Sequence, residues 1–130
     1  MNGIDVKGEL SVKFLPNGRW VEIQKPVTVR VDCSYFTVAK NFQTDFASVP
    51  RIFWNILPPF GLYTTAAVIH DWMYYTGVHP KKRADEIFYR LMIFYGVSGF
   101  KARIMYLAVK WFGGGAWKNH RQKERERTRL

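Results

Sequence analysis

The sequence has few of the residues that build disulfides or thiolate sites, with one cysteine, Cys33, among 130 residues. An internal disulfide needs two cysteines and a thiolate metal cluster needs more, so the sequence excludes both. The composition is therefore compatible with folding in a reducing cytoplasm.

Acidic residues are also scarce, since 10 Asp and Glu stand against 20 Lys and Arg, for a formal net charge of +10. Such a balance favours partners that carry phosphate, namely nucleic acid or anionic lipid, or else an acidic protein surface. The densest basic stretch runs from Lys118 to Arg129, where Glu124 and Glu126 dilute the charge. We interpret residues 118–130 as a solvated basic tail that follows a single domain of residues 1–117.

Long apolar runs are missing as well. The longest uncharged run, Ile52 to Ile69, is interrupted by Pro58-Pro59 and Gly61, which would break a membrane-spanning helix. The first residues, Met1 to Asp5, lack the basic and then apolar pattern of a signal peptide. We expect a soluble protein with no transmembrane segment and no signal peptide.

The first third of the chain shows the two-residue period of β-strands. Apolar residues alternate in part over residues 8–15, a turn signal follows at Pro16-Asn17-Gly18, and Trp20 to Ile23 looks extended, which together predict a β-hairpin. Val27 to Val31 alternates apolar and polar residues, and Tyr35 to Ala39 offers another short strand. These patterns predict a small antiparallel sheet with one wet face.

The remainder of the chain shows the 3.6-residue period of helices. Three apolar stripes are predicted to face inward: Tyr63, Ala66, Ala67, His70, Met73 and Tyr74; then Asp85, Phe88, Leu91, Met92 and Tyr95; then Phe100, Ile104, Leu107, Ala108 and Trp111. We expect Gly113-Gly114-Gly115 to end the third helix. The predicted fold class is α+β, with a small N-terminal antiparallel sheet followed by about three amphipathic helices, of which the first two form an antiparallel pair.

Two of these inward stripes each carry one ionisable group, His70 and Asp85. Helices joined by a short loop with Gly77 and Pro80 usually pack antiparallel, which would bring Asp85 against the imidazole of His70. A buried carboxylate is costly unless it is paired. The pair has two interpretations: a functional site, or a core histidine that a carboxylate satisfies.

The functional interpretation follows from the chemistry of histidine, whose ordinary pKa of about 6.5 suits proton transfer near neutrality. Asp85 would fix the tautomer of His70 and stabilise its protonated form. No serine or cysteine stands out as a nucleophile, so the simplest reaction is activation of water, which indicates hydrolysis. Asp71 and the loop residue Asp45 could supply oxygen ligands to Ca²⁺, although Asp45 could equally cap a short helix.

A set of motifs carries a resemblance to a known family. Pro59-Phe60-Gly61, then Thr65-Ala66, His70-Asp71, Tyr74 and Asp85 with Phe88, resemble the active-site helix pair of the bacterial secreted phospholipases A2. The resemblance implies His70 as the base, Asp85 as the residue that orients it, and Asp71, Asp45 and the Phe46 carbonyl as calcium ligands. It also implies a phospholipid or another ester as the substrate.

A second resemblance covers more of the chain. Four stretches are similar to a domain family of unknown function common in tailed phages and prophages: Thr44 to Pro50, Ala67 to Asp71, Arg83 to Asp85, and Met105-Tyr106. This resemblance implies a viral source, located in the host cytoplasm or the virion. It supports an alternative function as a non-enzymatic virion structural or assembly protein, a tail or head-tail component, that binds other virion proteins or nucleic acid and in which the His/Asp cluster is structural.

Overall fold

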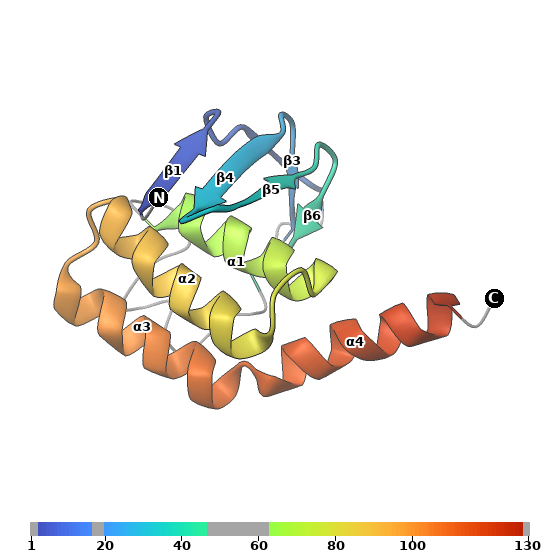
Figure 1. Cartoon of the computed structure of the whole chain (residues 1–130). Helices are drawn as coiled ribbons and strands as arrows, with labels where there is room; N and C mark the ends of the chain where they lie inside the picture. Colours follow the sequence, from blue (N-terminus) through green and yellow to red (C-terminus); the bar gives the residue numbers. More distant parts are fainter. Residues whose placement is uncertain (1–2, 17–19, 47–62, 129–130) are drawn as a thin grey trace. The chain divides into compact units, whose positions relative to one another are not determined.

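The computed structural model describes residues 3–16, 20–46 and 63–128, which belong to two units, residues 1–46 and residues 47–130 (Figure 1). The first unit contains antiparallel sheets, and the described part of the second contains four helices. The fold class is therefore α+β, as predicted. The expected single domain of residues 1–117 stays a prediction.

The described residues of the first unit form two three-stranded antiparallel sheets rather than one sheet. One sheet has the order β1 (Ile4–Lys7), β4 (Val27–Val31) and β5 (Ser34–Val38). Every second side chain of β4 is buried, so the alternation seen in the sequence marks an apolar and a more exposed face. Strand β1 was not predicted.

The second sheet has the order β2 (Val12–Phe14), β3 (Val21–Ile23) and β6 (Gln43–Thr44). The predicted hairpin is confirmed, because β2 and β3 pair antiparallel with Val12 opposite Ile23. Its turn residues 17–19 lie outside the described residues. Strand β6 was missed because a two-residue strand has no period of its own.

The second unit begins with the two helices that carry His70 and Asp85. Helix α1 (Thr64–Thr76) and helix α2 (Lys81–Phe94) run in opposite directions in Figure 1, as predicted. Gly77 ends α1 in a left-handed conformation, with φ of 65°, and its N–H bonds the Met73 carbonyl, which is the usual role of glycine at a helix end. All six residues of the predicted α1 stripe are buried.

Helix α3 (Gly99–Phe112) forms where predicted, but its predicted inward face is only partly correct, because Ala108 is buried and the two terminal aromatic residues are not. Phe100 and Trp111 are 79% and 66% exposed. The buried side chains of α3 are smaller or more flexible: Ala102, Met105, Ala108 and Val109. Small side chains such as Ala102 and Ala108 let neighbouring helices approach closely.

Helix α3 ends at Phe112 with Gly113 as its C-cap, as predicted, but a fourth helix that was not predicted, α4 (Gly114–Thr128), follows directly. Gly113 interrupts the helical run for a single residue, and helical structure resumes at Gly114. A glycine is required at position 113 because there is no room for a side chain. A Cβ there would lie 2.5 Å from the Val109 carbonyl oxygen and 2.7 Å from the Tyr74 hydroxyl. Among the described helices, none is long and apolar enough to cross a membrane.

Candidate functional site

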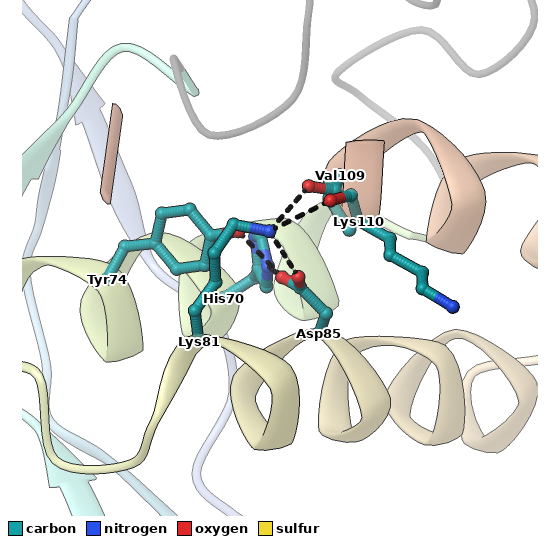
Figure 2. Close-up of polar contacts among 6 residues, drawn as sticks. All are labelled: His70, Tyr74, Lys81, Asp85, Val109 and Lys110. Carbon is teal, nitrogen blue, oxygen red and sulfur yellow. Dashed lines mark hydrogen bonds and ion pairs between the residues drawn. The ribbon is translucent and has the colours of Figure 1, made fainter. Parts of the chain in front are cut away.

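The predicted contact between His70 and Asp85 is present in the second unit. His70 Nε2 lies 2.8 Å from Asp85 Oδ1, and the two side chains come from the facing sides of α1 and α2 (Figure 2). His70 is fully buried and Asp85 is 2% exposed. The Phe88 ring stacks on the imidazole with centroids 4.4 Å apart, so apolar packing holds the ring in one orientation.

Asp85 is the centre of a hydrogen-bond network that joins three helices. The Tyr74 hydroxyl of α1 donates to Asp85 Oδ1 at 2.7 Å, and Lys81 Nζ of α2 donates to Asp85 Oδ2 at 2.8 Å (Figure 2). Lys81 Nζ also donates to the carbonyls of Val109 and Lys110 on α3, at 2.9 and 3.2 Å. Both oxygens of the buried carboxylate are therefore satisfied, as burial of a charge requires.

The network sets the protonation states of its two central residues. Burial lowers the pKa of His70, and the nearby Lys81 lowers it further, although Asp85 acts in the opposite sense. Burial alone would raise the pKa of Asp85, but the hydrogen bonds from His70, Lys81 and Tyr74 outweigh it and bring the pKa below its usual value. At neutral pH Asp85 is ionised and His70 is neutral.

These protonation states fix the tautomer of His70. An ionised carboxylate can only accept hydrogen bonds, so the hydrogen between the two residues belongs to His70 Nε2. The remaining ring nitrogen, Nδ1, then carries the lone pair. This is the tautomer in which a histidine can accept a proton through Nδ1 while Asp85 stabilises the resulting charge.

Asp71 is the next residue of α1, about 100° around the helix from His70. Its side chain is buried, with 5% exposure. Its negative charge adds to burial in raising the pKa of Tyr63, and it contributes in the same direction at Tyr74. Asp71 thus places a second carboxylate in the same buried region of α1 as the His70–Asp85 pair.

The other two expected calcium ligands, Asp45 and Phe46, lie at the end of the first unit, directly after β6. Phe46 has a φ of 62°, which is unusual for a bulky residue, and its N–H donates to Thr44 Oγ1 at 3.0 Å. The turn fixes the direction of the Phe46 backbone. Within the described ranges, no three His, Cys, Asp or Glu side chains gather into a group that could hold a metal.

The catalytic roles of His70 and Asp85 stay predictions, as do the metal-binding roles of Asp45, Phe46 and Asp71. The motif Pro59-Phe60-Gly61 lies outside the described residues. Lys81 was missed by the sequence interpretation. A signal for it existed, because Lys81 precedes Asp85 by four residues and therefore lies on the same side of α2.

Comparison with known proteins gives partial matches. Two proteins of Sinorhizobium fredii (strain NBRC 101917 / NGR234) are similar to this chain. The uncharacterized protein y4jT is 41% identical over 73 residues, which are 55% of this chain and 22% of the relative. The uncharacterized protein y4iH is 36% identical over 80 residues, which are 57% of this chain and 32% of the relative.

The chain therefore matches about a third or less of the length of these two relatives. No solved structure matches it. The family model described as "Protein of unknown function (DUF1353)" matches residues 21–109, a range that contains every candidate site residue, and the chain belongs to this family.

Proposed function

We propose that the chain is a hydrolase of phospholipid or other ester bonds, with a calcium-dependent site of the phospholipase A2 type. The observation that carries the proposal is the 2.8 Å contact between His70 Nε2 and Asp85 Oδ1 on two antiparallel helices. The Tyr74 hydroxyl and the Lys81 ammonium hold the same carboxylate. The pair is thereby preorganised, which is what a general base and the residue that orients it require.

In the proposed reaction, His70 Nδ1 accepts a proton from a water molecule as the water oxygen attacks the ester carbonyl. Asp85 remains ionised and stabilises the imidazolium through its bond to Nε2. The same proton is then available for the departing alcohol. The lowered pKa of His70 supports this role, because it keeps the imidazole neutral and able to accept a proton at pH 7.

The donor chemistry on the chain fits calcium, which prefers carboxylate and main-chain carbonyl oxygens. Asp71 would contribute its carboxylate from α1, and Asp45 with the Phe46 carbonyl would contribute oxygens from the loop after β6. The left-handed conformation of Phe46 supports this assignment, since unusual backbone conformations gather at ligand sites. Bound calcium would supply positive charge that stabilises the oxyanion formed from the ester carbonyl.

The complete burial of His70 supports a second candidate function. A fully enclosed histidine with a satisfied carboxylate is also what a purely structural network requires. In this alternative the chain is a non-enzymatic virion structural or assembly protein, and the network of His70, Tyr74, Lys81 and Asp85 only holds α1, α2 and α3 together.

The substitution His70→Gln separates the two functions, since glutamine keeps polarity and approximate bulk but cannot act as the base. The measurement is calcium-dependent hydrolysis of phospholipid vesicles and of short-chain esters by the full chain. For an enzyme, His70→Gln should lower the rate by about 100-fold or more, the usual scale for removal of a general base.

The matched control is His79→Gln, which makes the same chemical change at a partly exposed position outside the network. This control should keep full activity. If the unmodified chain hydrolyses none of several phospholipids and esters in the presence of calcium, the hydrolase proposal is wrong. The structural alternative then predicts that His70→Gln lowers the free energy of unfolding and nothing else.

A further inference from the structure

A concave site lies between α2 and α3, and neither His70 nor Asp85 lines it. Its volume is about 480 Å³, within the range of small-ligand sites. Helices α2 and α3 lie next to each other in Figure 1. The side chains that line this α2–α3 groove are Arg83, Glu86, Tyr89, Arg90, Arg103, Tyr106, Leu107 and Lys110.

The α2–α3 groove combines positive charge with aromatic rings. Four of its lining residues are Arg or Lys, and one is acidic. That acid, Glu86, lies 3.8 Å from Arg83 and offsets one of the four positive charges, so the groove keeps an excess of three. The positive charges come from both helices, an arrangement that a bound anion would stabilise.

Two tyrosines lie within this charged surface. The rings of Tyr89 on α2 and Tyr106 on α3 meet edge to face, with centroids 5.9 Å apart. Lys110 Nζ lies 6.0 Å from the centre of the Tyr106 ring. The α2–α3 groove therefore offers ring surfaces beside cations, and nucleotides carry both a planar base that stacks on such rings and a phosphate that binds such cations.

The spacing of these residues explains why they converge. On α3, Arg103, Tyr106 and Lys110 are separated by three and four residues, so they share one face. Arg83 and Arg90 on α2 are separated by seven residues and share a face in the same way. This face of α3 differs from its buried face, which contains Ala102 and Met105, and none of the groove residues is fully buried.

We propose that the α2–α3 groove binds a nucleotide, either free or as a unit of single-stranded nucleic acid, through its phosphate and its base. The concave shape and the paired rings favour a single nucleotide unit over a flat anionic membrane. The groove shares no side chain with the hydrolase site, which contacts Lys110 only through its main-chain carbonyl, so the test of the groove does not depend on the activity of His70.

The test measures binding of the full chain to fluorescein-labelled oligothymidylate of about 12 nucleotides by fluorescence anisotropy, with unlabelled thymidine monophosphate as competitor. The double variant Arg103→Gln/Lys110→Gln should weaken binding tenfold or more and reduce the salt dependence of the affinity, because two phosphate contacts are lost. Tyr106→Leu should weaken binding by about tenfold at unchanged net charge, because stacking is lost.

The matched control is Lys82→Gln/Lys101→Gln, which removes two charges from exposed positions on the same two helices, outside the groove. It should change the affinity by less than about twofold. Competition by the monophosphate would identify the ligand as a free nucleotide, and its absence would identify single-stranded nucleic acid. Either result supports binding of a nucleotide in the α2–α3 groove.

Three results would overturn the proposal. The first is an equal loss in the control and in the groove double variant, which would mean that only net charge matters. The second is duplex DNA binding as tightly as the single strand, which would exclude stacking on the tyrosines. The third is binding to phosphatidylglycerol vesicles without binding to any oligonucleotide, which would assign the basic groove to a membrane surface.

Discussion

Lys81 precedes Asp85 by one turn of α2, and its ammonium donates to Asp85 Oδ2 at 2.8 Å while it also donates to the Val109 carbonyl at 2.9 Å. One lysine thus neutralises a buried acid and binds the C-terminal end of α3, where helix carbonyls carry partial negative charge. The electrostatics of the His70–Asp85 pair are therefore coupled to the packing of α3.

Replacement of Lys81 by methionine should raise the pKa of both residues of the pair. The Lys81 charge lowers the pKa of His70, and its hydrogen bond lowers the pKa of Asp85, so its removal reverses both effects. The His70 titration can be followed by NMR of the imidazole carbons. The free energy of unfolding should also fall by about 2 kcal/mol, the scale of a hydrogen bond to a charged group.

Lys82→Met is the matched control for this experiment, because Lys82 is the exposed neighbour of Lys81. Lys82→Met should leave the pKa of His70 unchanged. An unchanged His70 pKa in Lys81→Met would show that Lys81 serves packing alone.

Stability should fall as the pH is lowered from 7 to 5. Burial lowers the pKa of His70 in the folded chain below its ordinary value of 6.5, so below pH 6.5 the unfolded chain binds a proton that the folded chain does not. This favours unfolding, by at most about 1.4 kcal/mol per pH unit for one proton. The lowered pKa of Asp85 adds a second loss as the pH falls below 3.8.

Urea unfolding at pH 7, 6 and 5 measures this dependence. In His70→Gln the upper part of the slope should become smaller, because the buried titrating group is gone. His79 also has a lowered pKa, from partial burial and the charge of Arg83, so His79→Gln measures its separate share. If the free energy of unfolding changes with pH equally in His70→Gln and in the unmodified chain, His70 is not the source of this dependence.

Much of the helical unit follows from periodicity, and the errors have identifiable causes. The inward face of α1 was predicted because large apolar residues recur every three or four positions. The same rule failed in part on α3, where Phe100 and Trp111 of the predicted stripe are exposed, while Met105 outside the stripe is buried. Which face of a helix is buried depends on the neighbouring helices and on their distance from it. The periodicity of one helix in the sequence gives neither.

Gly113 caps the end of α3, as predicted, but the start of a fourth helix at Gly114 was missed for a related reason. Consecutive glycines normally oppose further helix. Here a glycine is required at position 113 because a side chain would lie too close to the Tyr74 hydroxyl. Arg121 on α4 then donates to the Tyr74 and Tyr75 carbonyls at the end of α1, at 2.7 and 2.9 Å. These are contacts between residues 46 or more positions apart, which local propensity cannot indicate.

Gly77→Ala should disturb this contact between α1 and α4. Gly77 has a left-handed φ of 65°, and a Cβ there would overlap the Arg121 guanidinium. We expect a loss of about 1–2 kcal/mol from backbone strain and a further loss of about 1–3 kcal/mol as Arg121 leaves the two carbonyls. Urea unfolding measures the sum.

Gly96→Ala is the matched control, since Gly96 also has a positive φ, of 90°, but a Cβ there would meet nothing within 4 Å. Gly96→Ala should lower the free energy of unfolding only by the contribution of backbone strain. In an Arg121→Gln background, Gly77→Ala should cost no more than Gly96→Ala. Equal losses for the two glycine variants in the unmodified background would contradict the proposed contact.

Asp71→Asn tests the calcium site of the proposed hydrolase. Asparagine keeps the size of Asp71 and one oxygen ligand but removes the charge that binds a hard cation. We expect calcium affinity, measured by isothermal titration calorimetry, to fall tenfold or more. Asp45→Asn tests the other proposed carboxylate ligand, and we expect calcium affinity to fall by a similar factor.

Asp5→Asn is the control for these two variants, because Asp5 is an exposed acid on β1 and its loss changes the net charge equally. It should leave calcium binding unchanged, which would show that the effect depends on position rather than on total charge. A loss in Asp71→Asn without a loss in Asp45→Asn would restrict the site to the helical unit and exclude the loop after β6 as a source of ligands. If the unmodified chain takes up no calcium, the metal is removed from the proposed reaction, and any hydrolysis would then depend on His70 and Asp85 with another source of oxyanion stabilisation.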